Sequence, residues 1–314
     1  MPSFDAINYS LRPSKTVQRK IVFSGMAILQ HHLNLERMAY VGFGSIWFTD
    51  FTLAHRLLGV NDMISIEKDD IGYRRALFNA PYATVRVEPG FSYNVLPNLY
   101  RDASLAGRPW MVWLDYDYEL NESICEDVRS LIENAPENSI VIITFNGKDG
   151  KYGRPAERPE RLKALLGSVV PDALRPDTCK EDRIQGTLAN LSLDFMQSIA
   201  ADLARPGGFV PAFRLIYKDS TPMVTVGGVL PAKGAARVTR DVVDGAGWPG
   251  RPVKRITAPH LTMREAATLQ AKLPSTVKLS RAIVQGLGFD LEDEQIEAFQ
   301  TYYREYPAFA QIVT

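Results

Sequence analysis

Glycine and acidic residues follow two neighbouring apolar runs near the start of the chain. Gly42, Gly44 and Ser45 come directly after the run 38–41, and Glu67, followed by Lys68, ends the next run. A glycine turn lets backbone approach a ligand, and an acid about 20 residues further on can accept hydrogen bonds from ribose hydroxyls. This layout predicts a site for an adenosine-type cofactor.

Each of these residues also has a simpler explanation. Glycines end strands for many reasons, so a single Gly-x-Gly pattern is weak evidence. Glu67 could instead be a solvated carboxylate that begins a helix together with Asp69 and Asp70.

A second acidic pair, Asp115 and Asp117, follows the uncharged run 110–114. A carboxylate at a strand end can orient a reacting group or take a proton from it. The alternative is that the pair caps a helix that begins near Asn121.

Strand-like and helix-like segments alternate from residue 38 to residue 146. We expect buried strands over residues 38–41, 63–66, 83–87, 110–114 and 139–144. Regular alternation of this kind is typical of a doubly wound parallel sheet. Two further runs, 213–217 and 223–229, are separated by KDSTP, which predicts an antiparallel hairpin at the end of the series.

Two stretches of the chain resemble class I S-adenosylmethionine-dependent methyltransferases, and among them the small-molecule O-methyltransferases. The first is VEPGFSYNVLP at 87–97, and the second is MVWLDYDYEL at 111–120. The opening NYSLRPSKTVQRK also resembles the start of a group of uncharacterised bacterial O-methyltransferases. The resemblance covers residues 38–146 and implies a Rossmann-like α/β sheet of seven strands, with the predicted hairpin as its last two.

The resemblance also implies roles for individual residues. Gly90, Phe91 and Ser92 would lie beside the adenine, and Asp115 would face the methyl donor with Asp117 next to it. The expected cofactor-binding residues are therefore Gly42, Gly44, Ser45, Glu67, Lys68, Gly90, Phe91, Ser92 and Asp115. The expected catalytic residues are Asp115 and Asp117. Asp50 is a further candidate for binding the methionine ammonium, with a surface residue of its helix as an equal alternative.

Metal-dependent members of the resembled family pair the strand-four acid with an Asp-Asn dipeptide after strand five. This chain has Phe145-Asn146 there, so Asp115 and Asn146 are weak candidates for a metal site. We therefore do not expect a divalent metal to be required. Among the four histidines, none of which has metal-binding spacing, only His260 is a conceivable general base.

We expect three parts in the chain: a helical lead over 1–37, a methyltransferase domain over 38–230 with an insertion at 147–190, and a C-terminal part over 231–314. The last part would begin with a glycine-rich basic loop at 231–260 and continue with helices, the first opened by a capping box of Thr262 and Glu265. A final aromatic-rich helix is expected to follow within 291–312.

The composition of the chain indicates which kinds of partner and which cellular compartment are favoured. Lys plus Arg and Asp plus Glu each number 36, so no net field draws the chain to nucleic acid or membrane. Two cysteines, Cys125 and Cys179, and the lack of a long apolar segment favour the cytoplasm. Basic residues in 148–163 and 233–255 would attract an anionic acceptor, unless they are simply solvated loops.

These observations predict methyl transfer from S-adenosylmethionine to an oxygen or nitrogen of a small-molecule or nucleotide-like acceptor. Two alternatives stay open. The protein could be a non-enzymatic nucleotide sensor or partner protein that kept the fold. It could also be a nucleic-acid methyltransferase, although LDYDYEL lacks the Asn/Asp-Pro-Pro-aromatic motif of the amino-methylating enzymes. Neither a Gly-x-Ser-x-Gly elbow nor a P-loop is present in the sequence.

Overall fold

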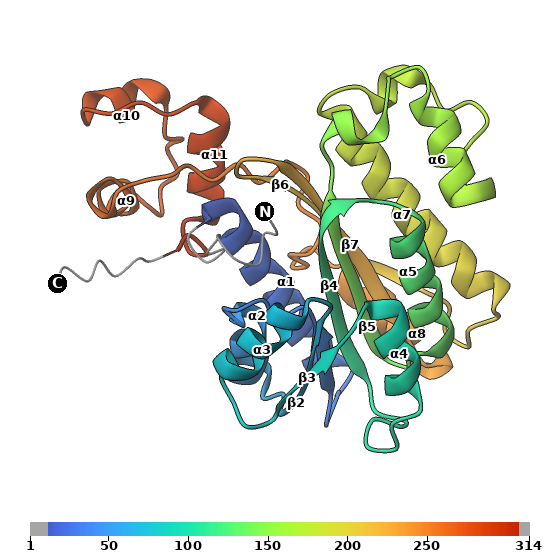
Figure 1. Ribbon diagram of the computed structural model, residues 1–314. Helices are drawn as coiled ribbons and strands as arrows, with labels where there is room; N and C mark the ends of the chain where they lie inside the picture. The colour runs from blue at the N-terminus through green and yellow to red at the C-terminus, as the bar shows by residue number, and fades with distance from the viewer. Residues whose placement is uncertain (1–11, 308–314) are drawn as a thin grey trace.

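The computed structural model describes residues 12–307 and contains one seven-stranded sheet (Figure 1). The strands are β1 (Ala39–Gly42), β2 (Asp62–Glu67), β3 (Val85–Pro89), β4 (Trp110–Glu119), β5 (Ser139–Asn146), β6 (Val210–Lys218) and β7 (Pro222–Leu230). Their order is β3-β2-β1-β4-β5-β7-β6, with the first five parallel and β7 antiparallel to both of its neighbours. The predicted seven-stranded fold with a terminal hairpin is confirmed.

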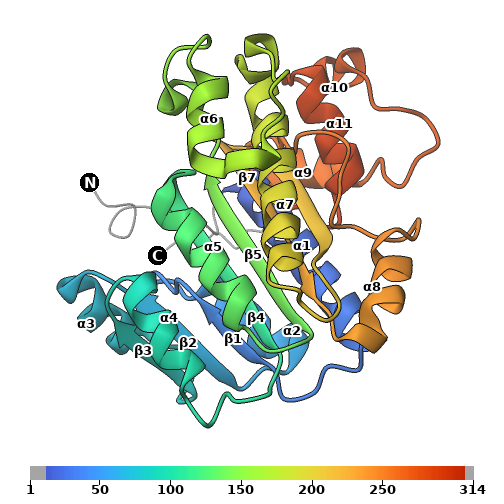
Figure 2. The same cartoon turned by 90° about the vertical axis from the view of Figure 1, so that its right-hand side faces the viewer.

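Helices cover both faces of this sheet, so β1, β5 and the first half of β4 are buried on both sides and are almost entirely apolar, whereas the edge strand β3 is partly exposed. One face packs against α4 (Ser92–Tyr100), α5 (Glu122–Asn134) and α7 (Arg183–Asp202), as Figure 2 shows, and α6 (Arg158–Leu166) packs against α5 and α7. The other face packs against α1 (Pro13–His32), α2 (Thr49–Leu58), α3 (Asp70–Asn79) and α8 (Ala236–Val243).

The strand order reverses between β1 and β4, which are neighbours in the sheet although β2 and β3 come between them in the chain. At such a point the connections leave the sheet in opposite directions and open a crevice beyond the carboxyl ends of the strands. The fold therefore places the loops after β1, β2 and β4 around one crevice.

Several predicted element boundaries were wrong. The expected loop at 231–260 contains the helix α8. The helix α7 begins at Arg183, inside the expected insertion. The strand β4 continues through Asp115 and Asp117 to Glu119, so both acids lie within the strand and not after it.

The C-terminal part contains α9 (Met263–Gln270), α10 (Arg281–Gly286) and α11 (Asp293–Tyr302). The predicted capping box is confirmed, because Thr262 and Glu265 each accept a hydrogen bond from the other's backbone N–H. Residues 1–11 and 308–314 lie outside the described residues. The first four residues of the opening segment NYSLRPSKTVQRK and the end of the expected last helix fall among them. Within 12–307, no helix is long and apolar enough to cross a membrane.

Candidate active site

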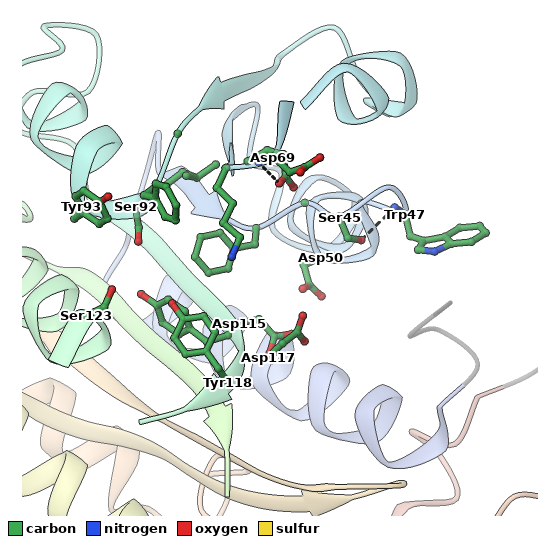
Figure 3. A pocket seen from close by; sticks show the side chains of 18 of the residues that line it. Ser45, Trp47, Asp50, Asp69, Ser92, Tyr93, Asp115, Asp117, Tyr118 and Ser123 are labelled. Carbon is green, nitrogen blue, oxygen red and sulfur yellow. Dashed lines mark hydrogen bonds between the residues drawn. The ribbon is translucent and has the colours of Figure 1, made fainter. Parts of the chain in front are cut away.

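A cavity of about 800 Å³ lies beyond the carboxyl ends of β1, β2, β3 and β4 (Figure 3). The predicted site residues that line it are Gly44, Ser45, Glu67, Lys68, Gly90, Phe91, Ser92, Asp115 and Asp117. Gly42 and Asn146 are not among its lining residues. The fold thus gathers residues that lie far apart in the sequence around one crevice.

The glycines after β1 are required by packing. A Cβ atom on Gly42 would lie 2.8 Å from the carbonyl oxygen of Trp113, and one on Gly44 would lie 2.6 Å from Ser65 Oγ. The amide of Gly44 donates a hydrogen bond of 3.0 Å to the same Ser65 oxygen. Close approach of Trp113 explains Gly42, and close approach of Ser65 and of the Phe48 ring explains Gly44, whatever binds in the cavity.

Glu67 ends β2 at the rim of the cavity and organises the turn that follows. Its Oε1 accepts a hydrogen bond of 3.1 Å from the amide of Asp69, and its carbonyl oxygen accepts one of 2.9 Å from Gly90. Burial raises the pKa of the Glu67 carboxyl above its ordinary value. The helix α3 is capped by Asp69, whose side chain accepts from the amide of Gly72, so Glu67 is not its cap.

Aromatic rings form one wall of the cavity. Phe91 and Tyr93 stack with their centroids 5.3 Å apart, and Lys68 Nζ lies 5.7 Å from the Phe91 centroid. Phe43 and Tyr116 meet edge to face at 5.2 Å. Rings of this kind provide flat apolar surface suited to a planar ligand such as a purine.

The buried carboxyl of Asp127, on α5, holds two lining residues in place. Its Oδ2 accepts hydrogen bonds from Ser92 Oγ at 2.5 Å and from Tyr116 OH at 2.7 Å. Burial raises the pKa of this carboxyl. Nothing in the sequence marked Asp127, because a polar residue on an amphipathic helix ordinarily faces water.

Asp115 and Asp117 reach the cavity because side chains alternate along β4. Trp113, two residues before Asp115, faces the layer of helices that contains α1, whereas Leu114 and Tyr116 face the opposite layer. In Figure 3 the side chains of Asp115 and Asp117 lie together opposite Asp50. The pairing of β4 with β5 is irregular between Asp115 and Glu119, the part of the strand that lines the cavity.

Asp115 forms an ion pair with a lysine from α1. Lys15 Nζ lies 2.5 Å from Asp115 Oδ2, and it also lies 5.1 Å from the Trp113 ring centroid and 5.3 Å from that of Tyr217. The Lys15 side chain is 3% exposed and that of Asp115 is 25% exposed. Lys15 therefore pairs with a carboxylate that still reaches the cavity.

Asp115 and Asp117 are not the cap of α5. Asn121 is the N-cap, and its side-chain oxygen accepts a hydrogen bond of 3.1 Å from the amide of Ile124. The capping alternative for the acidic pair is therefore wrong.

The two weak metal candidates are not brought together. The sheet register aligns Asp115 with Thr144 and Asn146 with Glu119, and the side chain of Asn146 accepts a hydrogen bond from the amide of Lys148. Over residues 12–307, no group of three or more His, Cys, Asp or Glu is placed to hold a metal ion. His260 is exposed and is not among the described lining residues, so the structure gives it no place at this site.

Buried polar residues of the helix α1 contribute to the site and were not predicted from the sequence. Its buried residues include four polar ones, Ser14, Lys15, Gln18 and Arg19. They form two pairs at i, i+4, a spacing that places them on one face of a helix. Arg19 lines the cavity and forms an ion pair with Asp50 at the start of α2. The i, i+4 spacing of these polar residues is the signal in the sequence that could have identified them.

The predicted turn between β6 and β7 anchors the start of α1. Asp219 accepts hydrogen bonds from the backbone amides of Ser14, at 2.9 Å, and Lys15, at 3.1 Å. Ser14 Oγ in turn donates to the carbonyl of Lys218. An acid at a helix N-terminus is favourable, and here it fixes the position from which Lys15 and Arg19 reach the site.

The basic residues of 148–163 and 233–255 lie away from this cavity. None of the twelve is among its lining residues within the described part of the chain. Eight of them form ion pairs: Lys151, Arg158, Arg161, Lys163, Arg237, Arg251, Lys254 and Arg255. Their charge is thus largely balanced locally.

Known structures of similar fold include three methyltransferase-related proteins. Trm1 from Pyrococcus horikoshii, in complex with S-adenosyl-L-methionine, aligns with a TM-score of 0.42 and 12% identity over 74% of this chain. The O-methyltransferase TomG from Streptomyces achromogenes aligns with a TM-score of 0.37 and 15% identity over 71% of this chain. The O-methyltransferase from Bacillus cereus aligns with a TM-score of 0.38 and 12% identity over 72% of this chain. This chain spans 58% of the length of Trm1, 91% of TomG and 92% of the Bacillus protein.

A search of curated proteins finds no match to this chain. A family model, in contrast, matches nearly all of it, from residue 7 to residue 314. With the sheet order and the crevice described above, this match identifies the chain as a member of the family described as "Putative O-methyltransferase".

Proposed function

We propose that this protein transfers a methyl group from S-adenosylmethionine to an oxygen of a small-molecule acceptor, with a nitrogen as the alternative. The observation that carries the proposal is the cavity whose lining includes both Glu67, at the end of β2, and Asp115, within β4. Membership of an O-methyltransferase family supports the choice of reaction. When bound, S-adenosylmethionine supplies an electrophilic methyl group on a positively charged sulfur.

The cavity divides into parts that suit different portions of this cofactor. Glu67 would accept hydrogen bonds from ribose hydroxyls, and the rings of Phe91 and Tyr93 would contact the adenine. The acids Asp50, Glu67, Asp69, Asp115 and Asp117 outnumber the two basic lining residues, Arg19 and Lys68. A cationic sulfonium compound is therefore favoured electrostatically over an anionic dinucleotide.

Asp115 would act on the acceptor. Its carboxylate would accept a hydrogen bond from an acceptor hydroxyl and so direct a lone pair of the oxygen at the methyl group. As the carbon–oxygen bond forms and the carbon–sulfur bond breaks, the hydroxyl proton would pass to Asp115 and S-adenosylhomocysteine would be the second product. Holding the two reactants in line converts a bimolecular step into an effectively unimolecular one, which is worth about 7 kcal/mol or more. Lys15 fixes the carboxylate in the required direction.

Isothermal titration calorimetry tests the choice of cofactor. S-adenosylhomocysteine is expected to bind with at least about 100-fold higher affinity than NAD, since the loop after β1 lacks the third glycine of dinucleotide sites. The bulky Trp47 and Phe48 occupy that loop instead. Equal binding of the two ligands, or binding of neither, would rule out the proposed cofactor.

Replacing Glu67 with alanine is expected to weaken S-adenosylhomocysteine binding by about 1.5 to 3 kcal/mol, the scale of hydrogen bonds to a charged group. In the wild type the affinity should fall as pH is lowered through the raised pKa of Glu67, because the protonated carboxyl accepts hydrogen bonds poorly. Glu88→Ala, at the end of the neighbouring strand β3 and outside the cavity lining, is the matched control. An unchanged dissociation constant in Glu67→Ala, at any pH, would remove Glu67 from the site.

A nucleotide sensor without catalysis is the second candidate, and one observation favours it. One oxygen of Asp115 is already engaged by Lys15, as a purely structural ion pair would require. A sensor binds S-adenosylhomocysteine and transfers no methyl group. Release of S-adenosylhomocysteine from S-adenosylmethionine in the presence of a panel of hydroxylated acceptors separates the two functions.

A further inference from the structure

A second cavity, of about 530 Å³, is lined by residues of α7, of the outermost strand β6 and of the C-terminal helix α11. It shares no lining residue with the candidate active site. Three arginines line it, Arg183, Arg214 and Arg255, against two acids, Asp182 and Glu294. The described lining therefore carries an excess of positive charge, although the net charge of the chain is zero.

Both acids of this cavity are engaged by one arginine. Arg255 Nη1 lies 2.8 Å from Asp182 Oδ1, and Arg255 Nε lies 3.2 Å from Glu294 Oε1. Although burial opposes the effect, these two carboxylates raise the pKa of the Arg255 guanidinium above its ordinary value. Within residues 12–307, neither acid forms an ion pair with Arg183 or Arg214.

Arg214 is half-buried and has no carboxylate partner. Its Nε donates a hydrogen bond of 2.8 Å to Asn190 Oδ1, and neither of its Nη atoms has a hydrogen-bond partner in the described part of the chain. Burial lowers the pKa of this guanidinium, and no neighbouring carboxylate opposes the effect. Arg205, whose pKa burial also lowers, instead donates through both Nη atoms to the carbonyls of Glu133 and Ala135. Arg214 thus loses hydration without gaining a protein acceptor at its Nη atoms.

Arg183 brings a second guanidinium to the same cavity. It is exposed at the start of α7 and forms no ion pair with any residue from 12 to 307. Asp177, on which its charge acts, is paired with Lys180. The start of α7 also lies beside Arg214, since Arg214 Nη2 is 3.6 Å from the position that a Cβ atom on Gly186 would take. Two guanidinium groups from separate elements are thus placed to bind one ligand.

The number and placing of these groups favour a phosphate over a carboxylate. One guanidinium fork can engage both oxygens of a carboxylate. A phosphate monoester has three acceptor oxygens and a charge of about −1.5 to −2 at pH 7, so it can bind two guanidinium groups at once. The cavity also has room for more than this group, because pockets for small molecules have volumes of about 300–1,000 Å³.

We propose that Arg183 and Arg214 form a binding site for a phosphate group, separate from the candidate active site. Arg255 supports the site by neutralising Asp182 and Glu294, which would otherwise repel the ligand. A bound phosphate would link α7 to β6. The proposal stands on this cavity alone and does not depend on methyl transfer, so phosphate and S-adenosylhomocysteine should bind without competing.

Calorimetry at constant ionic strength, with inorganic phosphate as the probe, tests this site. Wild type is expected to bind phosphate with a dissociation constant of about 1 mM or below. Arg214→Gln should weaken this binding by about 10-fold or more, because hydrogen bonds to a charged group are lost. Acetate should bind at least about 10-fold more weakly than phosphate, since it has only two oxygens and one charge. Tighter binding of ribose 5-phosphate than of inorganic phosphate would assign the site to a phosphorylated metabolite, and weaker binding would assign it to the free ion.

Arg154→Gln, which removes an exposed arginine outside the lining of this cavity, is the matched control and should stay within about twofold of wild type. S-adenosylhomocysteine binding within about threefold of wild type shows that Arg214→Gln is folded. Should that variant not fold, Arg183→Gln changes an exposed side chain and is also expected to weaken phosphate binding by about 10-fold.

Three results would overturn the proposal. They are no phosphate binding by wild type up to about 10 mM, an equal loss in Arg154→Gln and Arg214→Gln, and acetate binding as tight as that of phosphate. None of them bears on the proposed cofactor, which the S-adenosylhomocysteine titration measures separately.

Discussion

Replacing Asp115 with asparagine is expected to lower the turnover of the methyl acceptor by about 10²-fold or more, the usual contribution of a positioned acid–base group. The amide keeps the shape of the carboxylate but accepts hydrogen bonds less strongly and carries no charge. S-adenosylhomocysteine affinity should change by less than about threefold, since the proposed ribose and adenine contacts come from other strands. Single-turnover kinetics and calorimetry on the same preparation separate the two quantities.

The control for this variant must account for Lys15. Asp115→Asn leaves a nearly buried ammonium group with two aromatic rings and no carboxylate, so some loss of stability is expected. Measurements are therefore made well below the thermal midpoint of the variant. Glu119→Gln, at the end of the same strand and outside the cavity lining, is the matched control and should keep wild-type turnover. Wild-type turnover in Asp115→Asn would show that the residue has only a structural role.

The sheet was predictable because parallel strands buried on both faces are nearly continuous apolar runs. β5 and the first half of β4 are examples, and the alternation of such runs with helices fixed the order of elements. The second half of β4 was missed because its side chains alternate between a helix layer and a polar cavity. Asp115 and Asp117 consequently resemble a loop in the sequence.

The glycine turn and the strand-end acids could be placed in one crevice from the sequence, because carboxyl ends of parallel strands lie at one edge of a sheet. The contribution of α1 to this crevice could not be predicted in the same way. Lys15 meets Asp115 across 100 positions of the chain, and Arg19 meets Asp50 across 31. Whether a lysine on a helix is solvated or buried depends on such distant partners, which local spacing does not reveal.

Replacing Lys15 with methionine is expected to lower the free energy of unfolding by about 3 kcal/mol or more, because removing one member of a buried ion pair leaves the other charge uncompensated. The change also removes the contacts of the ammonium group with the rings of Trp113 and Tyr217. Methionine preserves the length of the side chain, so packing beside α1 is largely kept. Urea unfolding of wild type and variant measures the difference.

A double-mutant cycle with Asp115 separates the pair from the packing around it. Lys15→Met combined with Asp115→Asn replaces a charged pair with neutral groups of similar shape, so the double variant should be more stable than the sum of the two single losses predicts, by about 1.5 kcal/mol or more. If the stability losses of the two single variants add to that of the double variant within about 0.5 kcal/mol, Lys15 and Asp115 are not coupled.

The Lys15 variant also tests the role of Lys15 in catalysis. If Lys15 positions the carboxylate, Lys15→Met should lower turnover and leave S-adenosylhomocysteine affinity unchanged, whereas a lysine that only stabilises the fold would leave the turnover of the folded fraction at the wild-type value.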